Sequence, residues 1–196
     1  MYPVYESPYS VKETVDDKGY SNMFLLHLYF YSRIMSLCKP NTILEIGGGY
    51  GSLARIFGKL NPDISYTMVD LPESLFYAMV FLKKDFGDAN NFKFVPVGSV
   101  QDLYGKDYDL VINTSCWQDL NPKTVDSYAD MIENKLKVKY LYSMNYRFIE
   151  NTDIETLSYF NTEKWNTLYN SYNPAIIRID TNPKHNWLEV FLERLE

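Results

Sequence analysis

The stretch Leu44-Glu45-Ile46-Gly47-Gly48-Gly49-Tyr50-Gly51 decides how this chain folds. A compact apolar run, Thr42 to Ile46, ends where the glycines begin, and small residues follow at Ser52 and Ala54. An apolar run of this length indicates a buried strand, and glycine permits the sharp turn from such a strand into a helix. Glycine also lets a ligand approach the backbone, because no Cβ stands in the way. The stretch therefore predicts a strand, a ligand-binding turn and a helix.

Two familiar glycine patterns do not fit this turn. A phosphate-binding P-loop needs Gly-Lys-Ser/Thr, which is absent, and the dinucleotide pattern GxGxxG needs glycine at position 52, where the chain has Ser52. What remains is the acidic Glu45 followed by glycines at alternate positions, Gly47, Gly49 and Gly51. At the strand end, Glu45 could accept hydrogen bonds from a cationic amino group or from the amides of the loop itself.

Short β-rich runs alternate with helical ones along the rest of the chain, as in a parallel sheet with crossover helices. We expect strands at 42–46, 65–70, 92–97, 108–113 and 139–145, and helices at 52–60, from Pro72 to Gly87 and from Asn121 to Leu136. Two last strands, 175–180 and 187–194, are joined by only six residues, so they must be antiparallel. The sequence thus predicts an α/β fold whose seven-stranded, mostly parallel sheet ends in an antiparallel hairpin, with helices on both faces.

Length and composition favour a single domain. The chain has 196 residues, of which residues 1–40 are expected to form an arm and an apolar helix at 18–38, a candidate lid on the main unit 41–196. A further helix is expected within 147–173. With 19 basic and 25 acidic residues the net charge is −6, which gives no basic surface for nucleic acid.

The sequence also speaks against a membrane or secreted protein. The longest apolar stretch, Met23 to Tyr31, is far shorter than the ~20 residues that span a bilayer. Met1 to Ser10 has no basic segment of the kind that begins a secretory signal. The two cysteines, Cys38 and Cys116, have no metal-site spacing and are expected to be reduced thiols. We therefore expect a cytoplasmic protein, for which a homo-oligomer is one open arrangement.

The glycine turn and a second acidic residue together resemble the class I S-adenosylmethionine-dependent methyltransferases. Asp70 ends the next strand, 25 residues after Glu45, and the reversed terminal strand is a further likeness. The resemblance implies a Rossmann-like sheet, S-adenosyl-L-methionine as cofactor, and Asp70 on the ribose hydroxyls. A plain alternative is that Asp70 only caps the following helix.

A narrower resemblance, over about 43–145, is to bacterial sugar O-methyltransferases. It is carried by Ile46 to Ile56, Tyr66 to Glu73, and Asp109 to Ser115. The chain departs from that family at Asp119-Leu120, where a Glu-Met-like pair is expected, and this leaves the acceptor open. The resemblance implies methyl transfer to a hydroxyl of a carbohydrate-like small molecule. A non-sugar natural product and a non-catalytic cofactor-binding subunit are the alternatives, while Ser52 argues against a nicotinamide oxidoreductase.

Ligands of open α/β sheets bind beyond the carboxyl ends of the strands, which nominates the site residues. The candidate cofactor-binding residues are Glu45, Gly47, Gly48, Gly49, Gly51, Asp70, Leu71, Gly98, Ser99, Val100, Asn113, Thr114 and Ser115. The candidate acceptor-binding residues are Trp117, Gln118, Tyr146, Arg147 and Tyr20. For Trp117 the plain alternative is a place in the core. The many tyrosines outside the cofactor half, among them Tyr29, Tyr31, Tyr159 and Tyr169, are expected to line the acceptor pocket.

Methylation of a hydroxyl needs a group that removes its proton. His185 is the leading candidate, because its loop is expected at the cofactor end of the sheet, and Asp119 and Glu150 are rivals. His27 lies among apolar residues and is expected to be a buried histidine with satisfied hydrogen bonds. No residues are spaced as metal ligands, so we expect no metal site in the chain, although an ion held mainly by substrate hydroxyls stays open.

Overall fold

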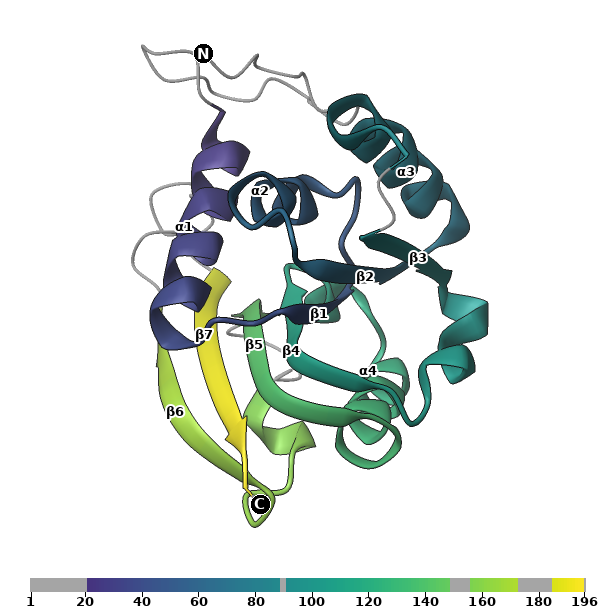
Figure 1. The fold of residues 1–196 in the computed structure, drawn as a ribbon. Coiled ribbons are helices and arrows are strands. Elements are labelled where there is room, and N and C mark those ends of the chain that lie inside the picture. Colours follow the sequence, from purple (N-terminus) through teal and green to yellow (C-terminus); the bar gives the residue numbers. More distant parts are fainter. Residues whose placement is uncertain (1–20, 89–90, 149–155, 173–184, 196) are drawn as a thin grey trace.

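The computed structural model describes residues 21–88, 91–148, 156–172 and 185–195. These residues form one seven-stranded sheet in the order β3-β2-β1-β4-β5-β7-β6 (Figure 1). The strands are β1 Thr42–Ile46, β2 Ser65–Asp70, β3 Phe92–Pro96, β4 Asp107–Thr114, β5 Lys137–Phe148, β6 Trp165–Tyr172 and β7 His185–Arg194. The first five strands pair in parallel, whereas β7 lies antiparallel between β5 and β6. The predicted mixed α/β fold is confirmed.

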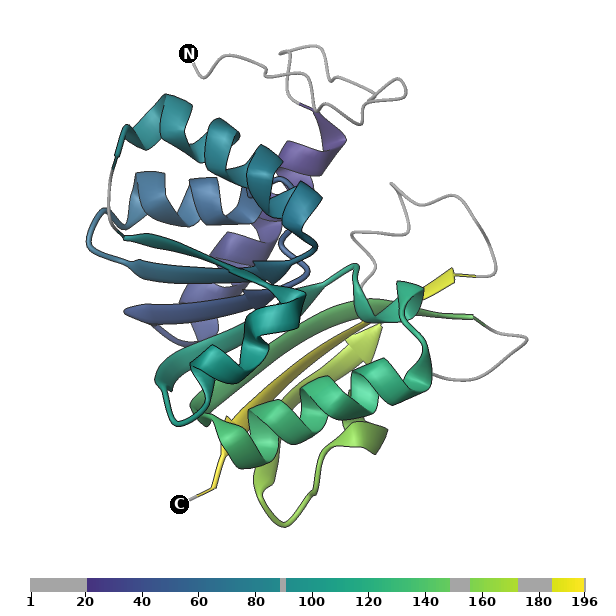
Figure 2. The same cartoon turned by 90° about the vertical axis from the view of Figure 1, so that its right-hand side faces the viewer.

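Helices cover both faces of this sheet (Figure 2). One face carries α1 Asn22–Leu37, α2 Ser52–Leu60 and α3 Pro72–Phe86; the other carries α4 Pro122–Asp130 and the 3₁₀ segment η1 Val97–Leu103. Alternation along the strands feeds both cores: Ile43 of β1 joins the α1–α3 side, and Leu44 joins the α4 side. A strand buried on both faces has the continuous apolar run that the sequence shows at 42–46.

Local signals place the helix ends. Asn121 caps α4 by accepting the Thr124 amide at 3.0 Å, and α4 runs on through the π-helical turn η3, Met131–Lys135. Gly87 ends α3 with a positive φ of 63°. Ser21 caps α1, which is shorter than the predicted helix at 18–38.

The segment after β5 corrects the sequence analysis. The helix expected within 147–173 is wrong for its second half, because Trp165–Tyr172 forms the edge strand β6, preceded by the short 3₁₀ turn η4 Thr156–Tyr159. Only Trp165 of β6 is buried, so the strand has no apolar alternation for a sequence reading to detect. The antiparallel hairpin exists but pairs β6 with β7; the strand expected at 175–180 lies outside the described residues.

Helix α1 is tied to the sheet by a buried carboxylate. Glu189 of β7 is fully buried, and it accepts a 2.9 Å ion-pair hydrogen bond from Arg33 Nε and a 3.1 Å bond from the Tyr29 hydroxyl. Tyr142 of β5 donates a third bond to the same group at 3.2 Å. The Arg33 guanidinium also lies 4.1 Å from the ring centre of Tyr169 in β6. One carboxylate thus joins α1 to the antiparallel end of the sheet.

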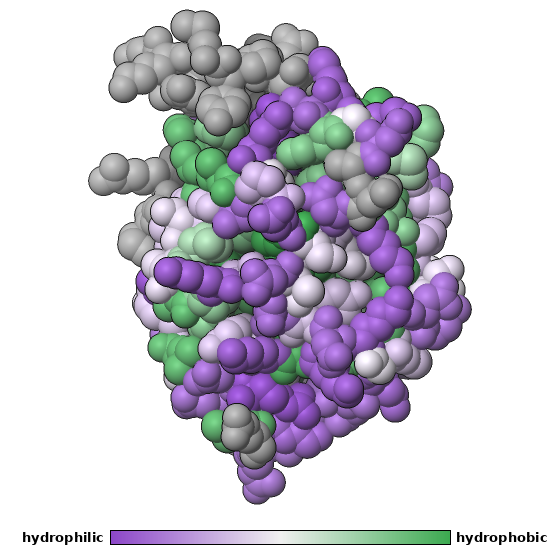
Figure 3. All heavy atoms as spheres, viewed as in Figure 1, coloured by the Kyte–Doolittle hydropathy of each residue, from purple (hydrophilic) through white to green (hydrophobic). Residues whose placement is uncertain are grey.

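Some apolar side chains of α1 and α3 remain exposed, although the surface around them is mostly polar (Figure 3). Leu25 and Leu28 of α1, and Phe76 and Val80 of α3, are each more than a third exposed. Within the described residues, no helix has the length and apolar character to cross a membrane.

Replacing the buried carboxylate by its amide tests this attachment. Glu189→Gln keeps the shape but removes the charge opposite Arg33, so we expect the free energy of unfolding in urea to fall by about 2–3 kcal/mol. Asp107→Asn is the matched control, because the Asp107–Lys137 pair is about three-quarters exposed on both sides and should change stability by less than about 1 kcal/mol. Equal losses in the two variants would show that the buried group has no special role.

Candidate active site

The glycine turn lies at the carboxyl edge of the sheet and is held in a left-handed conformation. Gly47, Gly49 and Gly51 have φ values of 81°, 55° and 86°, which residues with a side chain rarely adopt. The Gly47 amide donates to the Val69 carbonyl of β2 at 2.8 Å, and Gly51 caps α2 without a side-chain hydrogen bond. The predicted strand, turn and helix are confirmed.

Each glycine has a different reason to lack a side chain. A Cβ on Gly47 would lie 2.4 Å from both Cβ and Sγ of Cys116, in the loop after β4. A Cβ on Gly48 would lie 2.7 Å from Oε2 of Glu45, so this glycine makes room for the carboxyl group. Gly49 faces open space, and only its φ is restrictive. The turn is therefore packed from below and open at Gly49.

Glu45 lies beneath this turn. Its carboxyl group is almost fully buried and accepts a 3.0 Å hydrogen bond from the Tyr66 hydroxyl. Burial raises the pKa of Glu45 to about 7, outweighing the Tyr66 hydrogen bond that lowers it, with nearby Asp70 raising it further. Glu45 therefore exchanges its proton near neutral pH.

Asp70, at the end of β2, fastens the turn. Its Oδ2 accepts the Gly49 amide at 2.8 Å, and its Oδ1 accepts the amide of the adjacent Leu71 at 2.7 Å. Asp70 therefore holds the turn and does not cap α3, whose N-cap is Leu71 without a side-chain hydrogen bond, and each carboxylate oxygen keeps a second lone pair. Leu71 itself is more than half exposed beside this edge.

Two buried asparagines organise the strand ends behind the turn. Asn113 of β4 donates to the Ile46 carbonyl at 2.9 Å and accepts the Asn145 side-chain amide of β5 at 2.8 Å. Asn145 Oδ1 in turn accepts the amides of Cys116 and Trp117 at 3.1 and 3.0 Å. Asn113 is fully buried, so the structure gives it a scaffolding position behind the turn.

The chain turns sharply just after β4. Thr114 is buried, while Ser115 has a φ of 55°, the one positive value outside glycine among the described residues. Strained backbone of this kind gathers at functional sites. The Ser115 amide donates to the Met144 carbonyl at 2.8 Å, which directs the loop over the ends of β4 and β5.

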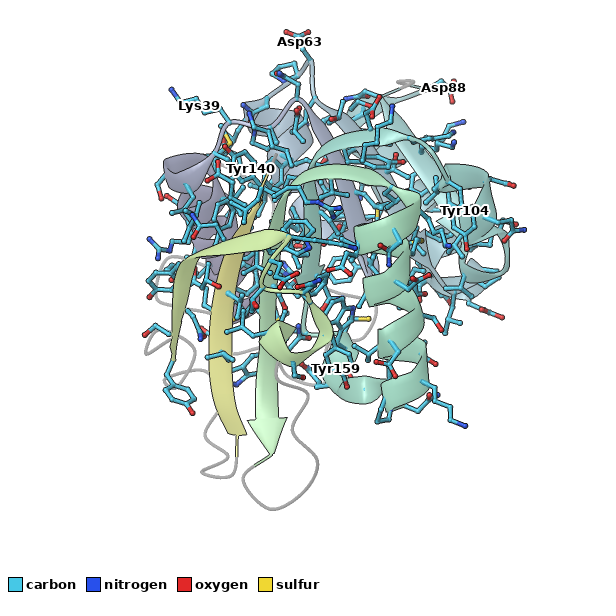
Figure 4. The ribbon with its side chains drawn as sticks, turned by 90° about the horizontal axis from the view of Figure 1, so that it is seen from below. Lys39, Asp63, Asp88, Tyr104, Tyr140 and Tyr159 are labelled. Carbon is cyan, nitrogen blue, oxygen red and sulfur yellow. The ribbon has the colours of Figure 1, made fainter. Side chains whose placement is uncertain are left out.

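The structure corrects the expected role of Trp117. Its ring is fully buried and lies parallel to Phe160, with centroids 6.1 Å apart, so it belongs to the core and not to a sugar-stacking surface. Tyr159, beside α4 in Figure 4, meets the Trp117 ring edge-on. Gln118 and Asp119 follow in the 3₁₀ turn η2, Trp117–Asp119, and burial raises the pKa of Asp119.

His185 begins β7, opposite Phe148 of β5, rather than lying in a loop. Its backbone is therefore on the carboxyl side, as predicted. The last β4 pair is Thr114 with Met144, so His185 stands four residues of β5, about 13 Å, beyond that pair. This places it on the rim of the site.

Tyr146 and Arg147 lie at the end of β5, opposite Trp187 and Asn186, and only their backbone is described. Tyr20 and Glu150 lie outside the described residues, so their predicted roles stay predictions.

The sequence analysis missed one residue of this region, Tyr128 of α4. Burial raises the pKa of Tyr128, and the charges of Cys116 and Asp70 raise it further. Tyr128 also lines a hollow of about 380 Å³ between η1 and α4, together with Val97 and Val100. Its place in the apolar repeat of α4 indicated a core residue, so no sequence signal marked it.

Of the three residues predicted after β3, only Val100 lines this hollow. Gly98 is exposed, and Ser99 kinks η1. Tyr104, at the far end of η1, lies on the outside of the molecule (Figure 4). Within the described ranges, no three His, Cys, Asp or Glu side chains gather in a way that could hold a metal ion.

Comparison with known proteins gives likeness of fold. No family model and no curated protein matches the sequence. Among solved structures, the N-methyltransferase NodS from Bradyrhizobium japonicum, in complex with S-adenosyl-L-homocysteine, has 17% identity and a TM-score of 0.66, over 92% of this chain and 90% of its own. The magnesium protoporphyrin IX methyltransferase ChlM from Synechocystis, with bound SAM, has 10% identity and the same TM-score, over 88% of this chain and 80% of its own.

The mitomycin 7-O-methyltransferase MmcR is similar at 16% identity and a TM-score of 0.58, over 80% of this chain. This chain spans about half the length of that enzyme, 49%. The chain thus has the Rossmann-like fold of methyltransferases that act on oxygen and on nitrogen.

A graded set of alanine variants tests the packing of the turn. Gly47→Ala adds strain at positive φ and a clash with Cys116, so we expect a loss of about 2–4 kcal/mol in unfolding free energy. Gly49→Ala adds only the strain, about 1 kcal/mol. Gly98→Ala, where a Cβ meets nothing within 4 Å, should change stability by less than about 0.5 kcal/mol. Any other order, measured in urea, would contradict the described turn.

Proposed function

We propose that this chain binds S-adenosyl-L-methionine at the carboxyl edge of its sheet and transfers the methyl group to a hydroxyl of a sugar or sugar-containing small molecule. The observation that carries the proposal is the contact of the glycine turn with two carboxylates. The amide of left-handed Gly49 donates a hydrogen bond to Asp70, and Glu45 is buried beneath the turn. The methyltransferase-like fold and the SAM and S-adenosyl-L-homocysteine complexes named among its neighbours support the choice of cofactor.

The polar groups at this edge match the parts of the cofactor. Asp70 offers two remaining lone pairs to a ribose diol, and Glu45 offers a carboxylate to the cationic amino group. The first amides of α2, which Gly51 leaves without a side-chain cap, suit the carboxylate of the amino acid. Val97, Val100 and the ring of Tyr128 offer an apolar hollow for the adenine.

When bound, the cofactor supplies an electrophilic methyl group on a sulfonium. The share of this chain is to position the acceptor in line and to remove the hydroxyl proton as the new O–C bond forms. Asp119 in η2 and His185 on the rim are the candidate bases. The raised pKa of Asp119 makes it a stronger base than an exposed aspartate, whereas His185 would have to act from further out.

The sugar assignment rests on the resemblance described above, and the net charge of −6 disfavours a nucleic-acid acceptor. Oxygen is favoured as acceptor because Asn113-Thr114-Ser115 is not the Asn-Pro-Pro-Tyr type of loop used on exocyclic amines. A labelled-cofactor assay over nucleotide sugars, amines and non-sugar phenols separates these acceptors. Methylation of amines alone would overturn the hydroxyl assignment, and methylation of phenols alone would overturn the sugar.

Calorimetry with matched aspartate variants tests cofactor binding. Asp70→Ala should weaken binding of S-adenosyl-L-homocysteine at least tenfold, because it removes both the diol acceptor and the clamp on Gly49. Asp109→Ala is the control: Asp109 likewise accepts two backbone amides, those of Asn41 and Thr42 at 2.8 and 3.0 Å, but precedes Leu110 near the amino end of β4. Its affinity should match the wild type. No binding to the wild type, or a preference for NAD, would overturn the cofactor assignment.

Glu45 gives cofactor binding a pH dependence. With its pKa raised to about 7, the free protein holds this proton at pH 6, and a cationic amino group favours the ionised form, so binding below pH 7 must release it. The affinity for S-adenosyl-L-homocysteine should therefore rise about tenfold between pH 6 and pH 8. Calorimetry at pH 6 in buffers of different ionisation enthalpy measures the released proton. Glu45→Gln should abolish both effects; equal dependence in the variant would show that Glu45 does not contact the amino group.

A further inference from the structure

His27 of α1 reaches the start of α2, next to the glycine turn. Its Nδ1 lies 2.8 Å from Oγ of Ser52, which is the first residue of α2 and directly follows Gly51. Ser52 is buried. This serine is also the residue that breaks the dinucleotide pattern, since GxGxxG requires glycine at its position. The departure from that pattern thus creates a hydroxyl that a residue of α1 can hold.

The His27–Ser52 bond persists at neutral pH. Burial lowers the pKa of His27 to about 4, so the imidazole is neutral and carries one donor and one acceptor nitrogen. A serine hydroxyl can donate or accept, so either tautomer satisfies the pair. The ring also packs near Phe30, with centroids 6.0 Å apart, and Phe30 meets Tyr142 of the sheet at 6.1 Å.

Helix α1 cannot shift freely under His27, because it is fastened elsewhere. Arg33 and Tyr29 bind the buried Glu189 of β7. Tyr31 donates a 2.8 Å bond to the Asn61 side chain at the other end of α2, where α1 and α2 lie side by side (Figure 1). Helix α1 therefore fixes the position of Ser52 relative to the sheet. This attachment is independent of β1, the strand that leads into the glycine turn.

We propose that His27 is a positioning residue for cofactor binding, which holds Ser52 and thereby fixes Gly51 and the first amides of α2. This inference rests on the proposed function, because those amides are assigned to the cofactor carboxylate. It assigns α1 a bracing role in place of the lid expected from the sequence.

Three single variants and one double variant at one helix interface test the proposal. His27→Phe keeps an aromatic ring but loses the bond, and Ser52→Ala removes the partner; each should weaken S-adenosyl-L-homocysteine binding about fivefold to tenfold in calorimetry. The double variant should be no weaker than either single one, because both remove the same interaction. His27→Asn places an amide near the Nδ1 position and should recover most of the affinity.

Tyr31→Phe is the matched control. It removes one hydrogen bond between the same two helices, but at the Asn61 end, remote from the turn. Its urea midpoint should fall as much as that of His27→Phe, while its affinity stays within twofold of the wild type. If affinity falls equally in both variants, or stays within twofold in His27→Phe, the positioning role is overturned.

Hydrogen exchange of the ligand-free protein separates this proposal from the proposed function. The hydrogen-bonded amides of Gly49, Gly51 and Arg55 should exchange faster in His27→Phe and Ser52→Ala than in Tyr31→Phe, whichever ligand the protein binds. Unchanged exchange in all three would refute the positioning of the turn, whereas a wild type that binds neither sulfur cofactor would refute the cofactor assignment alone.

Discussion

The hydrogen bond between the buried side chains of Asn113 and Asn145 is the constraint on which the carboxyl edge depends. Parallel strands end in carbonyls and amides that have no further partner in the ladder, and burying them unpaired costs about 1–3 kcal/mol each. Asn113 satisfies the end of β1 and Asn145 satisfies the start of the loop after β4, while their own amides bind each other. Ser143 and Thr156 extend the chain of bonds to η4. Loop, turn and strand ends are thereby fixed relative to one another before any ligand binds.

The two carboxylates of the edge differ because their surroundings differ. Asp70 accepts two backbone amides, those of Gly49 and Leu71, and its side chain is only partly buried. Glu45 is enclosed beneath Gly48 and accepts a hydrogen bond from the Tyr66 hydroxyl, and burial raises its pKa to about 7. One group is suited to neutral hydroxyls and the other to a cation that can displace its proton. The sequence analysis already offered these two roles from the places of Glu45 and Asp70 at the strand ends, but the difference in burial between them is visible only in the structure.

The sequence was most informative where one residue type had one physical use. The apolar run at 42–46 and the alternating glycines each predicted an element whose place the structure confirms. It failed at β6, where only Trp165 is buried, and at Trp117, whose indole serves a sugar platform or a core equally well by composition. Tyr128 was missed because nothing in its helix distinguishes a core position from one that lines the hollow beside η1. Such ambiguities depend on which neighbours the fold supplies, and a single sequence does not contain them.

The tyrosines that the sequence analysis expected in the acceptor pocket are a further case in which the sequence did not show the neighbours. Several of them contact α1 or belong to it. Tyr29, Tyr31 and Tyr169 serve the attachment of this helix: two donate hydrogen bonds and one lies under the Arg33 guanidinium. A buried ion pair such as Arg33–Glu189 contributes little net stability compared with apolar residues of the same size, since both charges lose water. What it does supply is a single orientation, because rotating α1 by one residue would take Arg33 and Tyr29 away from the Glu189 carboxylate. An element that only covered a pocket would not need this. A helix that sets the distance between β7 and the first turn of α2 needs such a fixed orientation. In the proposed arrangement, His27 is the residue through which α1 holds that first turn.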